Sequence, residues 1–536
     1  MFTPLEKATV DTVFNAMTTA FADRAAVIFE DRTITYRELR ATAYSIAIRL
    51  RELGVRKEDK VGILMPNCFE YLCLYMAAFL VGAWVVPINS RIKRNELRNI
   101  LLNSDLRTLF VQESMDNQNF AEMVHEMRGE LPLLRDLIVR RDNPKADMQA
   151  MDRFFEVMDN PEPKIRDFAP AGLSEDDVAL LAYTSGTTSS PKGVMITHRG
   201  LVQTSHLTGQ LWKFEPRDDA AVLSIAPLYA AQGFLAVLLD LCSGVPMYWL
   251  SSFSPNEIIR AISKGRAKVF HTQPTMWNLL LSSPLAKFAS FKGIEKTIVS
   301  GSLCSRSLAE RIEQTTGSIL LNGYGLIEAT GVVTVTRPDD PPEVRFSTVG
   351  RPIPGVEVRI VDENRRPVKP GETGELAVRG YLMKGYYKDE ARTRAVIDEQ
   401  GWLYSGDLAC QYEGGENIQI VGRVKDMIIR GGFNVYPVDL EEQLLLLGGV
   451  QDAAVVGRAD EILSEAIVAF VVPKPGFRFT KGDIMRHLRE NLANNKLPDD
   501  IFFLKQLPTI LSGKILKNVL RQWANTEVPH DELQPL

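Results

Sequence analysis

Short runs of apolar and β-branched residues alternate with helix-length amphipathic segments along most of this chain, and this alternation restricts the fold more than any other feature. Strands separated by segments long enough for a helix join in βαβ units, which build a largely parallel sheet. The rhythm occupies residues 36–111 and returns between residues 220 and 320. The expected helices are Tyr36–Leu53, Phe69–Leu80 and Arg94–Asn103, and the expected strands are Lys60–Met65, Trp84–Pro87, Thr108–Val111, Ala221–Ser224, Pro246–Trp249, Lys268–His271 and Lys296–Ser300.

From about Gly350 the pattern changes to short strands joined by turn residues, which predicts a smaller β-rich subdomain. A last α/β segment follows, and the boundary before it is expected near residues 423–426. A chain of 536 residues is too long for one ordinary core, so at least two domains are expected. The expected strands here are Val356–Val361, Gly374–Arg379, Ile418–Val421, Ala453–Val456 and Ala466–Val472, and the helices are Asp439–Leu447 and Lys481–Leu492.

Charge and cysteine content restrict the partners and the compartment. The net charge of -5 provides no basic surface, so nucleic acid is not expected as a principal partner. The five cysteines contain no C-x-x-C pair, and the six histidines show no metal-ligand spacing. This argues against a disulfide framework or a zinc site. Together with an N-terminus that lacks a signal-peptide pattern, it favours a cytoplasmic protein.

One uncharged run, Tyr71–Ile88, reaches the lower length limit of a transmembrane helix. We interpret it instead as a buried helix followed by a buried strand, with Gly82 as the break between them. A single borderline run flanked by Glu70 and Asn89 is weak evidence for a membrane protein. No membrane span is therefore expected.

The segment LAYTSGTTSSPKG, residues 181–193, carries the strongest chemical signal. Its hydroxyls and backbone N–H groups can surround a polyphosphate, and Lys192 adds positive charge. It is not a Walker A loop, because Gly193 follows the lysine where that motif requires Ser or Thr. A plain polar linker is the alternative, and the density of hydroxyls argues against it.

This segment resembles the phosphate-binding signature of the adenylate-forming superfamily, which includes acyl-CoA synthetases, nonribosomal peptide adenylation domains and beetle luciferases. The resemblance covers nearly the whole chain and is strongest to an acyl-CoA synthetase; Ser189 stands where the family usually has glycine. It implies an α/β fold with a large N-terminal domain of parallel-rich αβαβα sheets and a β-barrel-like subdomain, residues 1–424. Residues 425–536 would form a small mobile C-terminal α+β domain that carries the catalytic lysine.

Further family signatures follow in order. The string LNGYGLIE, residues 321–328, would stack Tyr324 on the adenine and place Glu328 on the magnesium ion that accompanies ATP. By the same resemblance Asp407, in GWLYSGDL, would hold the ribose hydroxyls with help from Arg423. The implied nucleotide-binding set is Thr184, Ser185, Gly186, Thr187, Thr188, Gly301, Ser302, Asn322, Gly323, Tyr324, Asp407 and Arg423, with Glu328 and Thr184 as metal ligands.

The C-terminal signatures imply a domain that turns between two half-reactions. Lys425 would be the pivot, and Gly431 and Gly432 would border the tunnel for the thiol. The family's catalytic lysine falls at Lys514, in LPTILSGKI, where it would bridge the substrate carboxylate and the α-phosphate. The implied catalytic set is Lys514, Glu328 and Lys192.

The segments that line the acyl pocket in relatives contain here no Lys, Arg, Asp or Glu apart from Glu328. This favours a neutral, apolar fatty or aromatic acid over an amino acid. Ala230 replaces a usual His or aromatic, and Ile327 replaces a usual threonine. His271 and Cys304 have a second interpretation, as satisfied core residues at strand ends. The implied pocket residues are Tyr229, Ala230, Gly233, His271, Thr275, Cys304, Gly325 and Ile327.

The expected function is that of an ATP-dependent carboxylic acid:CoA ligase, which uses ATP, Mg²⁺ and coenzyme A, acts on a small-molecule acid, and is a monomer or homodimer. One alternative is an acyl-AMP ligase that loads a carrier protein, although nothing after Lys514 resembles a carrier domain. A second is an ATP-binding protein that has lost catalysis, which Ile327 and Ala230 keep open. A luciferase-like oxygenation is a third.

Overall fold

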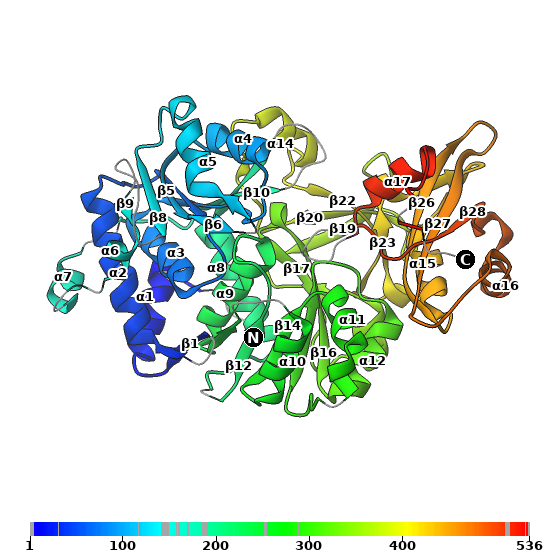
Figure 1. Cartoon of the computed structure of the whole chain (residues 1–536), viewed down its shortest axis with the longest axis horizontal. Helices are drawn as coiled ribbons and strands as arrows, with labels where there is room; N and C mark the ends of the chain where they lie inside the picture. The colour runs from blue at the N-terminus through cyan, green and yellow to red at the C-terminus, as the bar shows by residue number, and fades with distance from the viewer. Residues whose placement is uncertain are drawn as a thin grey trace.

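Four principal sheets organise the chain (Figure 1). Two large mixed sheets form the N-terminal part, a small antiparallel sheet follows, and the last sheet belongs to the C-terminal part. The mixed α/β architecture, with its larger N-terminal domain and smaller C-terminal domain, confirms the predicted fold class. The computed structural model describes residues 5–29, 32–115, 117–140, 149–156, 158, 161–168, 171–184, 191–217, 219–250, 254–287, 289–509, 515–530 and 532–533.

The larger sheet has nine strands in the order β18-β17-β16-β15-β14-β12-β13-β1-β2. The six strands from β16 to β1 pair in parallel, and antiparallel strands close both ends. The parallel rhythm predicted between residues 220 and 320 is thus confirmed. The strands are β1 (Ala25–Phe29), β2 (Arg32–Thr35), β12 (Ala221–Ser224), β13 (Met247–Trp249), β14 (Ala267–Thr272), β15 (Lys296–Ser300), β16 (Ile319–Leu326), β17 (Gly331–Val335) and β18 (Arg351–Pro352).

The second sheet has eight strands in the order β21-β11-β10-β4-β3-β5-β8-β9. Strands β10 to β9 pair in parallel, while β11 and β21 add antiparallel edges. The strands are β3 (Lys60–Leu64), β4 (Trp84–Pro87), β5 (Leu106–Gln112), β8 (Asp136–Arg140), β9 (Gln149–Ala150), β10 (Val178–Thr184), β11 (Lys192–Thr197) and β21 (Gly385–Tyr386).

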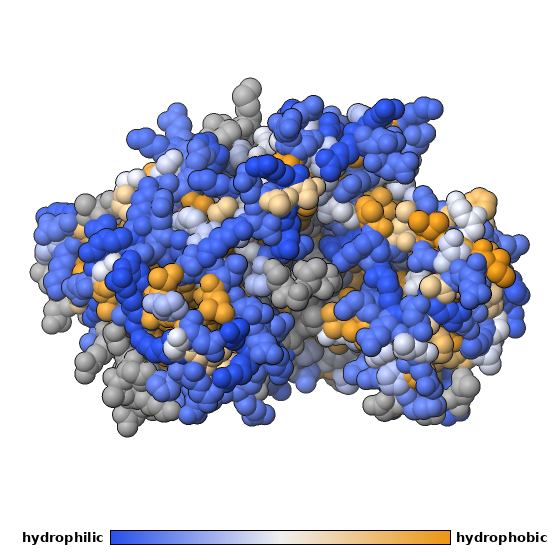
Figure 2. All heavy atoms as spheres, turned by 90° about the horizontal axis from the view of Figure 1, so that it is seen from above, coloured by the Kyte–Doolittle hydropathy of each residue, from blue (hydrophilic) through white to orange (hydrophobic). Residues whose placement is uncertain are grey.

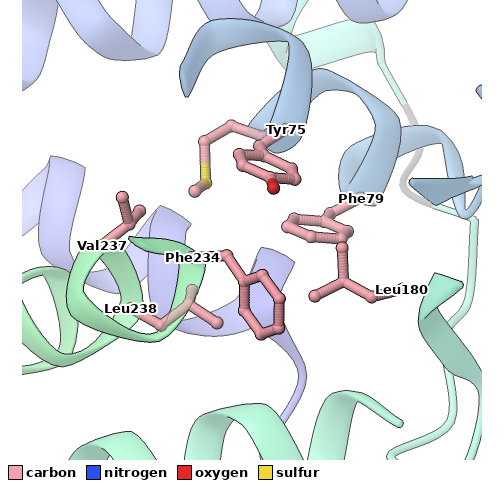
Figure 3. Close-up of a pocket in the computed structure, with 7 residues that line it drawn as sticks. Tyr75, Phe79, Leu180, Phe234, Val237 and Leu238 are labelled. Carbon is pink, nitrogen blue, oxygen red and sulfur yellow. The ribbon is translucent and has the colours of Figure 1, made fainter. Parts of the chain in front are cut away.

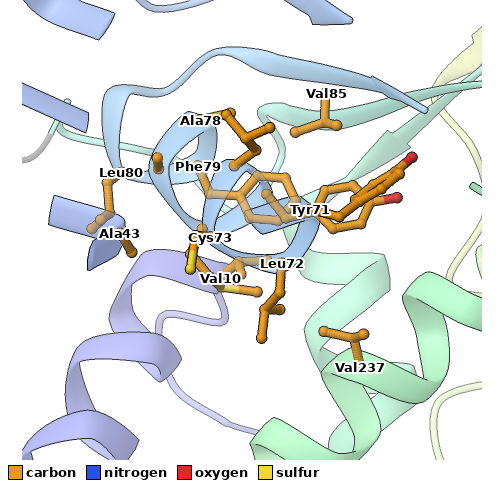
Figure 4. Close-up of a cluster of buried hydrophobic side chains, with 14 of the residues drawn as sticks. Val10, Ala43, Tyr71, Leu72, Cys73, Ala78, Phe79, Leu80, Val85 and Val237 are labelled. Carbon is orange, nitrogen blue, oxygen red and sulfur yellow. The ribbon is translucent and has the colours of Figure 1, made fainter. Parts of the chain in front are cut away.

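Helices between these two sheets build the main core. Buried residues of the larger sheet, such as Val27, and of the second sheet, such as Val61 and Leu180, belong to one apolar cluster with the helices between them. Figure 4 shows how residues of α3 dominate this cluster, with Val10 and Val237 contributed by neighbouring helices. The helices are α1 (Val10–Ala20), α2 (Tyr36–Glu52), α3 (Phe69–Val81), α8 (His198–Leu211) and α9 (Ala231–Ser243).

Other helices cover the outer faces of the two sheets. One apolar cluster joins α4 and α5 to the second sheet, and another joins α10, α11 and α12 to the larger sheet. These helices are α4 (Arg94–Ser104), α5 (Phe120–Met127), α10 (Pro255–Ser263), α11 (Pro274–Ser282) and α12 (Arg306–Thr316).

The apolar run that resembled a membrane span is divided as predicted. α3 ends at Val81, Gly82 adopts a left-handed conformation with φ +82°, and β4 begins at Trp84. All helix residues from Tyr71 to Val81 are buried in the main core. Among the described residues, the length and apolarity required to cross a membrane are not found together in any helix.

The remaining strands form two smaller sheets. The predicted β-rich subdomain is a four-stranded antiparallel sheet, and the C-terminal sheet has five strands with helices on both faces. The first contains β19 (Glu357–Val361), β20 (Gly374–Arg379), β22 (Leu403–Gln411) and β23 (Ile418–Arg423). The second contains β24 (Ile428–Arg430), β25 (Phe433–Val435), β26 (Val450–Asp460), β27 (Ser464–Pro473) and β28 (Asp500–Phe503), with α15 (Pro437–Leu446), α16 (Lys481–Asn491) and α17 (Lys517–Asn525).

The surface is mostly hydrophilic on the face drawn in Figure 2, with apolar side chains in scattered groups. Among the exposed apolar residues, Ile429, Phe433 and Ile462 belong to the C-terminal domain.

Candidate active site

The loop predicted to bind the polyphosphate connects the two strands of a hairpin. β10 and β11 pair antiparallel, and Thr184 lies opposite Lys192 at the end of the hairpin that carries the loop. The hairpin therefore fixes Lys192 where the loop rejoins the sheet. The side chain of Thr184 and the loop residues Ser185, Gly186, Thr187 and Thr188 lie outside the described residues.

A buried carboxylate brings together two of the predicted nucleotide-binding residues. The Tyr324 hydroxyl donates to Oδ2 of Asp407 at 2.7 Å, and Nε of Arg423 lies 3.0 Å from Oδ1. Asp407 on β22 is paired directly with Arg423 on β23, while Tyr324 comes from β16 of the larger sheet. Burial and the nearby Asp407 carboxylate raise the pKa of Tyr324 well above its usual value, so the phenol keeps its proton.

This cluster suits a vicinal diol. Each carboxylate oxygen of Asp407 has one protein donor and retains a further lone pair. Asp407 itself is only 6 % exposed, so the two donors also hold its orientation. The ribose-binding role that the family resemblance implied stays a prediction, and these contacts leave room for it.

Glu328 lies just beyond the end of β16, in the 3₁₀ turn Ile327–Ala329. Its Oε1 accepts a hydrogen bond from the Tyr386 hydroxyl at 2.9 Å, and its backbone carbonyl accepts from the amide of Met383 at 2.8 Å. Burial and the Glu328 carboxylate raise the pKa of Tyr386, so this phenol also remains a donor. The protein thus fixes one carboxylate oxygen of Glu328.

Tyr386 is a residue that the sequence analysis missed. It lies on β21, which pairs with β11, and the Lys192 ammonium is 5.9 Å from the centre of its ring. One tyrosine therefore connects Lys192, at the base of the phosphate loop, with Glu328. Its only sequence signal is the dipeptide Tyr386–Tyr387 after a glycine, which carries no recognisable motif.

Asn322 and the glycines of the predicted site have clear structural roles. The Asn322 side-chain nitrogen donates to the Arg345 carbonyl at 2.8 Å, so this group serves the fold. A Cβ on Gly325 would lie 1.6 Å from the Gly331 carbonyl oxygen, and one on Gly233 would lie 2.0 Å from the Pro227 carbonyl oxygen. No side chain fits at either glycine. Gly323 lies within β16 and is paired with Ser300, the last residue of β15; the exposed residues Gly301 and Ser302 follow Ser300 directly.

The predicted pocket residues lie at or just after the carboxyl ends of β14, β15 and β16 and at the starts of α9 and α11. Ala230 is the residue before α9, and Ile327 packs against the main core. His271 is 6 % exposed, and burial lowers its pKa to about 4, so its ring is neutral at physiological pH. Burial raises the pKa of the Cys304 thiol to about 12, which makes the thiolate inaccessible. Tyr229, which directly precedes Ala230, and Thr275, in α11, are both half-buried.

A small apolar cavity of about 10 Å³ lies between α3, β10 and α9. Figure 3 shows Phe234, Val237 and Leu238 of α9 facing Tyr75 and Phe79 of α3 across it. A void of this size is about that of a single water molecule, and its lining is apolar. It is a packing defect of the core and does not accommodate an acyl chain.

The predicted hinge and tunnel residues are exposed. Lys425 lies in the 3₁₀ turn Val424–Asp426, directly after Arg423. Gly431 and Gly432 form the turn between β24 and β25 with φ of +57° and +82°, which favours glycine at both positions. Lys514 lies outside the described residues.

No cluster of three or more His, Cys, Asp or Glu side chains suited to a metal ion occurs in the described part of the chain. The free oxygen of Glu328 is nevertheless a suitable ligand for a hard cation whose other ligands are phosphate and water oxygens. All five cysteines are free.

Comparison with known proteins shows which family this chain belongs to. The model of the AMP-binding enzyme family matches residues 14–387, and that of the AMP-binding enzyme C-terminal domain matches residues 439–514. A 3-[(3aS,4S,7aS)-7a-methyl-1,5-dioxo-octahydro-1H-inden-4-yl]propanoyl:CoA ligase of Mycobacterium tuberculosis is 34 % identical over 96 % of this chain and 98 % of its own length. The chain belongs to the AMP-binding enzyme family, in its acyl-CoA ligase branch.

Two further family members support this assignment. A feruloyl-CoA synthase of an Amycolatopsis species is 34 % identical over 91 % of this chain and 94 % of its own length. The structure of a benzoate CoA ligase from Burkholderia xenovorans is similar with a TM-score of 0.81, at 25 % identity, over 96 % of this chain and 99 % of that one. The family assignment confirms the resemblance inferred from the sequence, and the chain is an enzyme of the AMP-forming acid–thiol ligase class.

Proposed function

We propose that this enzyme activates a fatty or aromatic carboxylic acid with ATP as the acyl-AMP and transfers the acyl group to coenzyme A. The observation that carries the proposal is the arrangement around β16. This strand delivers Tyr324 to the Asp407–Arg423 pair, and Glu328 follows two residues after its end, so the proposed ribose site and a phosphate-side carboxylate are adjacent in the chain. Three relatives support an apolar acid that contains a ring. They are the dioxo-octahydro-indenyl propanoyl:CoA ligase, the feruloyl-CoA synthase and the benzoate CoA ligase.

In the first half-reaction, a carboxylate oxygen of the acid attacks the α-phosphate of ATP, and pyrophosphate leaves. The chain's contribution is positioning and charge stabilisation, because a phosphoryl centre needs little covalent assistance. Tyr324, Asp407 and Arg423 hold the nucleoside. Lys192 and Lys514 supply positive charge where negative charge concentrates, as family likeness implies for Lys514.

Magnesium fits this site, because Glu328 has one oxygen fixed by Tyr386 and a second oxygen with no partner among the described residues. With the Thr184 hydroxyl, Glu328 would hold the ion, which would neutralise the phosphates of ATP.

In the second half-reaction, the thiol of coenzyme A attacks the acyl carbonyl and AMP leaves. We propose a domain boundary at residues 424 and 425 and a rotation of the C-terminal domain about Lys425. The rotation removes Lys514 from the site and brings Gly431 and Gly432 to the path of the thiol. A reducing cytoplasm is the compartment that suits five free cysteines.

A pyrophosphate-release screen with ATP and magnesium tests the proposal. Fatty, aromatic and amino acids are compared with and without coenzyme A, and Lys514→Ala is the control variant. The proposal predicts release that depends on a fatty or aromatic acid and on Lys514, with thioester formed only when coenzyme A is present. Release without thioester would favour a carrier protein as acceptor, and ATP binding without release would favour a protein that has lost catalysis.

A further inference from the structure

Four neutral polar side chains form a hydrogen-bonded chain at the carboxyl ends of β14 and β15. Gln273 Nε2 donates to Gln232 Oε1 at 2.8 Å, and Gln232 Nε2 donates to Ser300 Oγ at 3.0 Å. Ser300 Oγ in turn lies 3.0 Å from Nε2 of His271. These residues come from α9, β14, β15 and the position before α11. The carboxyl ends of parallel strands are where open α/β sheets bind ligands.

The neutral ring of His271 allows this chain of hydrogen bonds to run in one continuous direction, in the tautomer whose Nε2 carries no proton. An uncharged imidazole can accept at Nε2, and the Ser300 hydroxyl, which already accepts from Gln232, can donate its proton there. Each glutamine amide group then uses one of its two N–H bonds. Among the described residues no other hydrogen bond is recorded for the Gln232 or Gln273 side chains. The chain therefore ends in spare amide donors.

These spare donors lie next to the predicted nucleotide site. Ser300 is paired with Gly323, the residue before Tyr324. A Cβ on Gly301 would lie 3.5 Å from Cγ of Gln273 and 3.6 Å from Oε1 of Gln232, so the absence of a side chain there leaves the two amides uncovered. Both glutamines are half-buried. The Trp212 ring packs against the His271 ring in an edge-to-face arrangement.

We propose that the acid bound by this enzyme carries a neutral oxygen acceptor, best a carbonyl, which accepts hydrogen bonds from the amides of Gln232 and Gln273. A purely apolar group would leave half-buried amide N–H groups unpaired, and sites built to bond a polar substituent discriminate strongly against analogues that lack it. A second charged group is disfavoured, because the predicted pocket segments contain no Lys, Arg, Asp or Glu except Glu328. This inference rests on the proposed ligase function and refines its substrate class.

The test compares nearly isosteric pairs of acids in the pyrophosphate-release assay with coenzyme A. The first comparison is between para-acetylbenzoic acid and para-isopropylbenzoic acid. The second compares medium-chain oxo acids, which carry the carbonyl at successive positions, with the unsubstituted acid. The expected result is a kcat/KM about tenfold or more higher for at least one oxo acid than for its apolar match. Equal or lower values for every oxo acid, with release still observed, would overturn this inference and leave the ligase function standing.

Variants then locate the preference. Gln232→Met and Gln273→Met are each expected to lower the ratio of oxo to apolar kcat/KM towards one. The control is Gln210→Met on α8, where Gln210 Nε2 lies 3.0 Å from His206 Nε2 in a similar pair outside the predicted pocket; it should leave the ratio unchanged. A ratio that survives both pocket variants contradicts the assignment to these amides. If a variant fails to fold, the wild-type ratio still decides the substrate class. No pyrophosphate release with any acid would instead reject the proposed function.

Discussion

Each carboxylate oxygen of Asp407 has a protein partner, which restricts the directions in which it could accept hydrogen bonds from ribose hydroxyls. Tyr324 and Arg423 approach opposite oxygens, so a diol must use the remaining lone pairs in a fixed orientation. The same contacts tie β22 and β23 of the small sheet to β16 of the larger sheet. In the proposed site, nucleotide affinity and the joint between these sheets would therefore depend on the same three side chains.

Asp407→Asn is expected to weaken ATP binding about tenfold to a hundredfold, because hydrogen bonds to a charged group contribute about 1.5–3 kcal/mol. The amide can accept through one atom only, so the Arg423 contact or the ribose contact is lost. Isothermal titration with ATP measures the change. Asp362→Asn is the matched control, because Asp362 accepts hydrogen bonds from backbone amides in a turn of the same sheet. An Asp407→Asn affinity within twofold of the wild type would argue against ribose binding here.

Tyr386→Phe removes the hydroxyl that fixes Glu328 without changing the ring beside Lys192. We expect a higher magnesium concentration for half-maximal pyrophosphate release, by about tenfold or more, since a hydrogen bond to a charged group contributes about 1.5–3 kcal/mol. The neighbouring Tyr387→Phe is the control, because its hydroxyl bonds to Asp105 on the other side of the segment. An unchanged magnesium requirement in Tyr386→Phe would show that Glu328 needs no such support.

Some residues of the candidate site can be recognised from the sequence, and others cannot. Tyr324, Asp407 and Arg423 stand in recognisable strings, and the structure brings them together. Tyr386 is 58 positions from Glu328 and lies on a two-residue strand, so neither periodicity nor spacing indicates the contact. The Gln232–Ser300–His271 network was missed for the same reason. The parallel pairing of β14 and β15 brings Ser300 beside His271, and Gln232 reaches them from α9.

At the scale of elements, local chemistry set several boundaries that the sequence predicted. The capping box of Thr35 and Glu38 starts α2 at Tyr36, and Gly82 separates α3 from β4. Strand order could not be predicted, because β1 joins β13 across more than two hundred residues of chain. Pairing between strands so far apart in the sequence depends on the packing of the whole core, so local sequence patterns do not predict it.

Gly82→Ala is expected to lower the free energy of unfolding by more than about 1 kcal/mol, since alanine is strained at positive φ. Its Cβ would also lie 2.9 Å from Cβ of Ala171. Urea denaturation followed by tryptophan fluorescence measures the effect. Gly129→Ala is the control, because no atom lies within 4 Å of the added carbon. Equal stability of the two variants would contradict the account of how α3 ends.

Asp240→Asn on α9 is expected to stabilise the enzyme. Both carboxylate oxygens are buried without a hydrogen-bond partner among the described residues, and burial raises the pKa of Asp240 well above its usual value. A carboxyl group whose pKa is raised by folding holds its proton more tightly in the folded state. Its contribution to stability is therefore fully present below the unfolded pKa of about 4 and is lost as pH rises above that value. The variant should therefore gain about 1 kcal/mol or more over the wild type near neutral pH, and the gain should increase from about pH 5 to about pH 8. Denaturation midpoints across this range test it; a gain that shrinks as pH rises would contradict the assignment.

At the scale of the whole molecule, the nucleotide-side residues and the predicted catalytic lysine belong to different domains. Asp407 and Arg423 belong to the small sheet, whereas Lys514 falls within the segment matched by the C-terminal family model. Arg423 ends β23 and Lys425 follows two residues later, so the ribose site and the proposed pivot are adjacent in the chain. Rotation at this point could reposition Lys514 without moving the bound nucleotide.

The exchange of labelled pyrophosphate into ATP tests most directly whether this site forms an acyl-adenylate. The account predicts exchange that requires the carboxylic acid and magnesium, proceeds without coenzyme A, and is abolished by Lys514→Ala. Such exchange can arise only if the bond to the α-phosphate is broken and remade. ATP turnover that releases ADP and phosphate, with no exchange of pyrophosphate, would contradict the account.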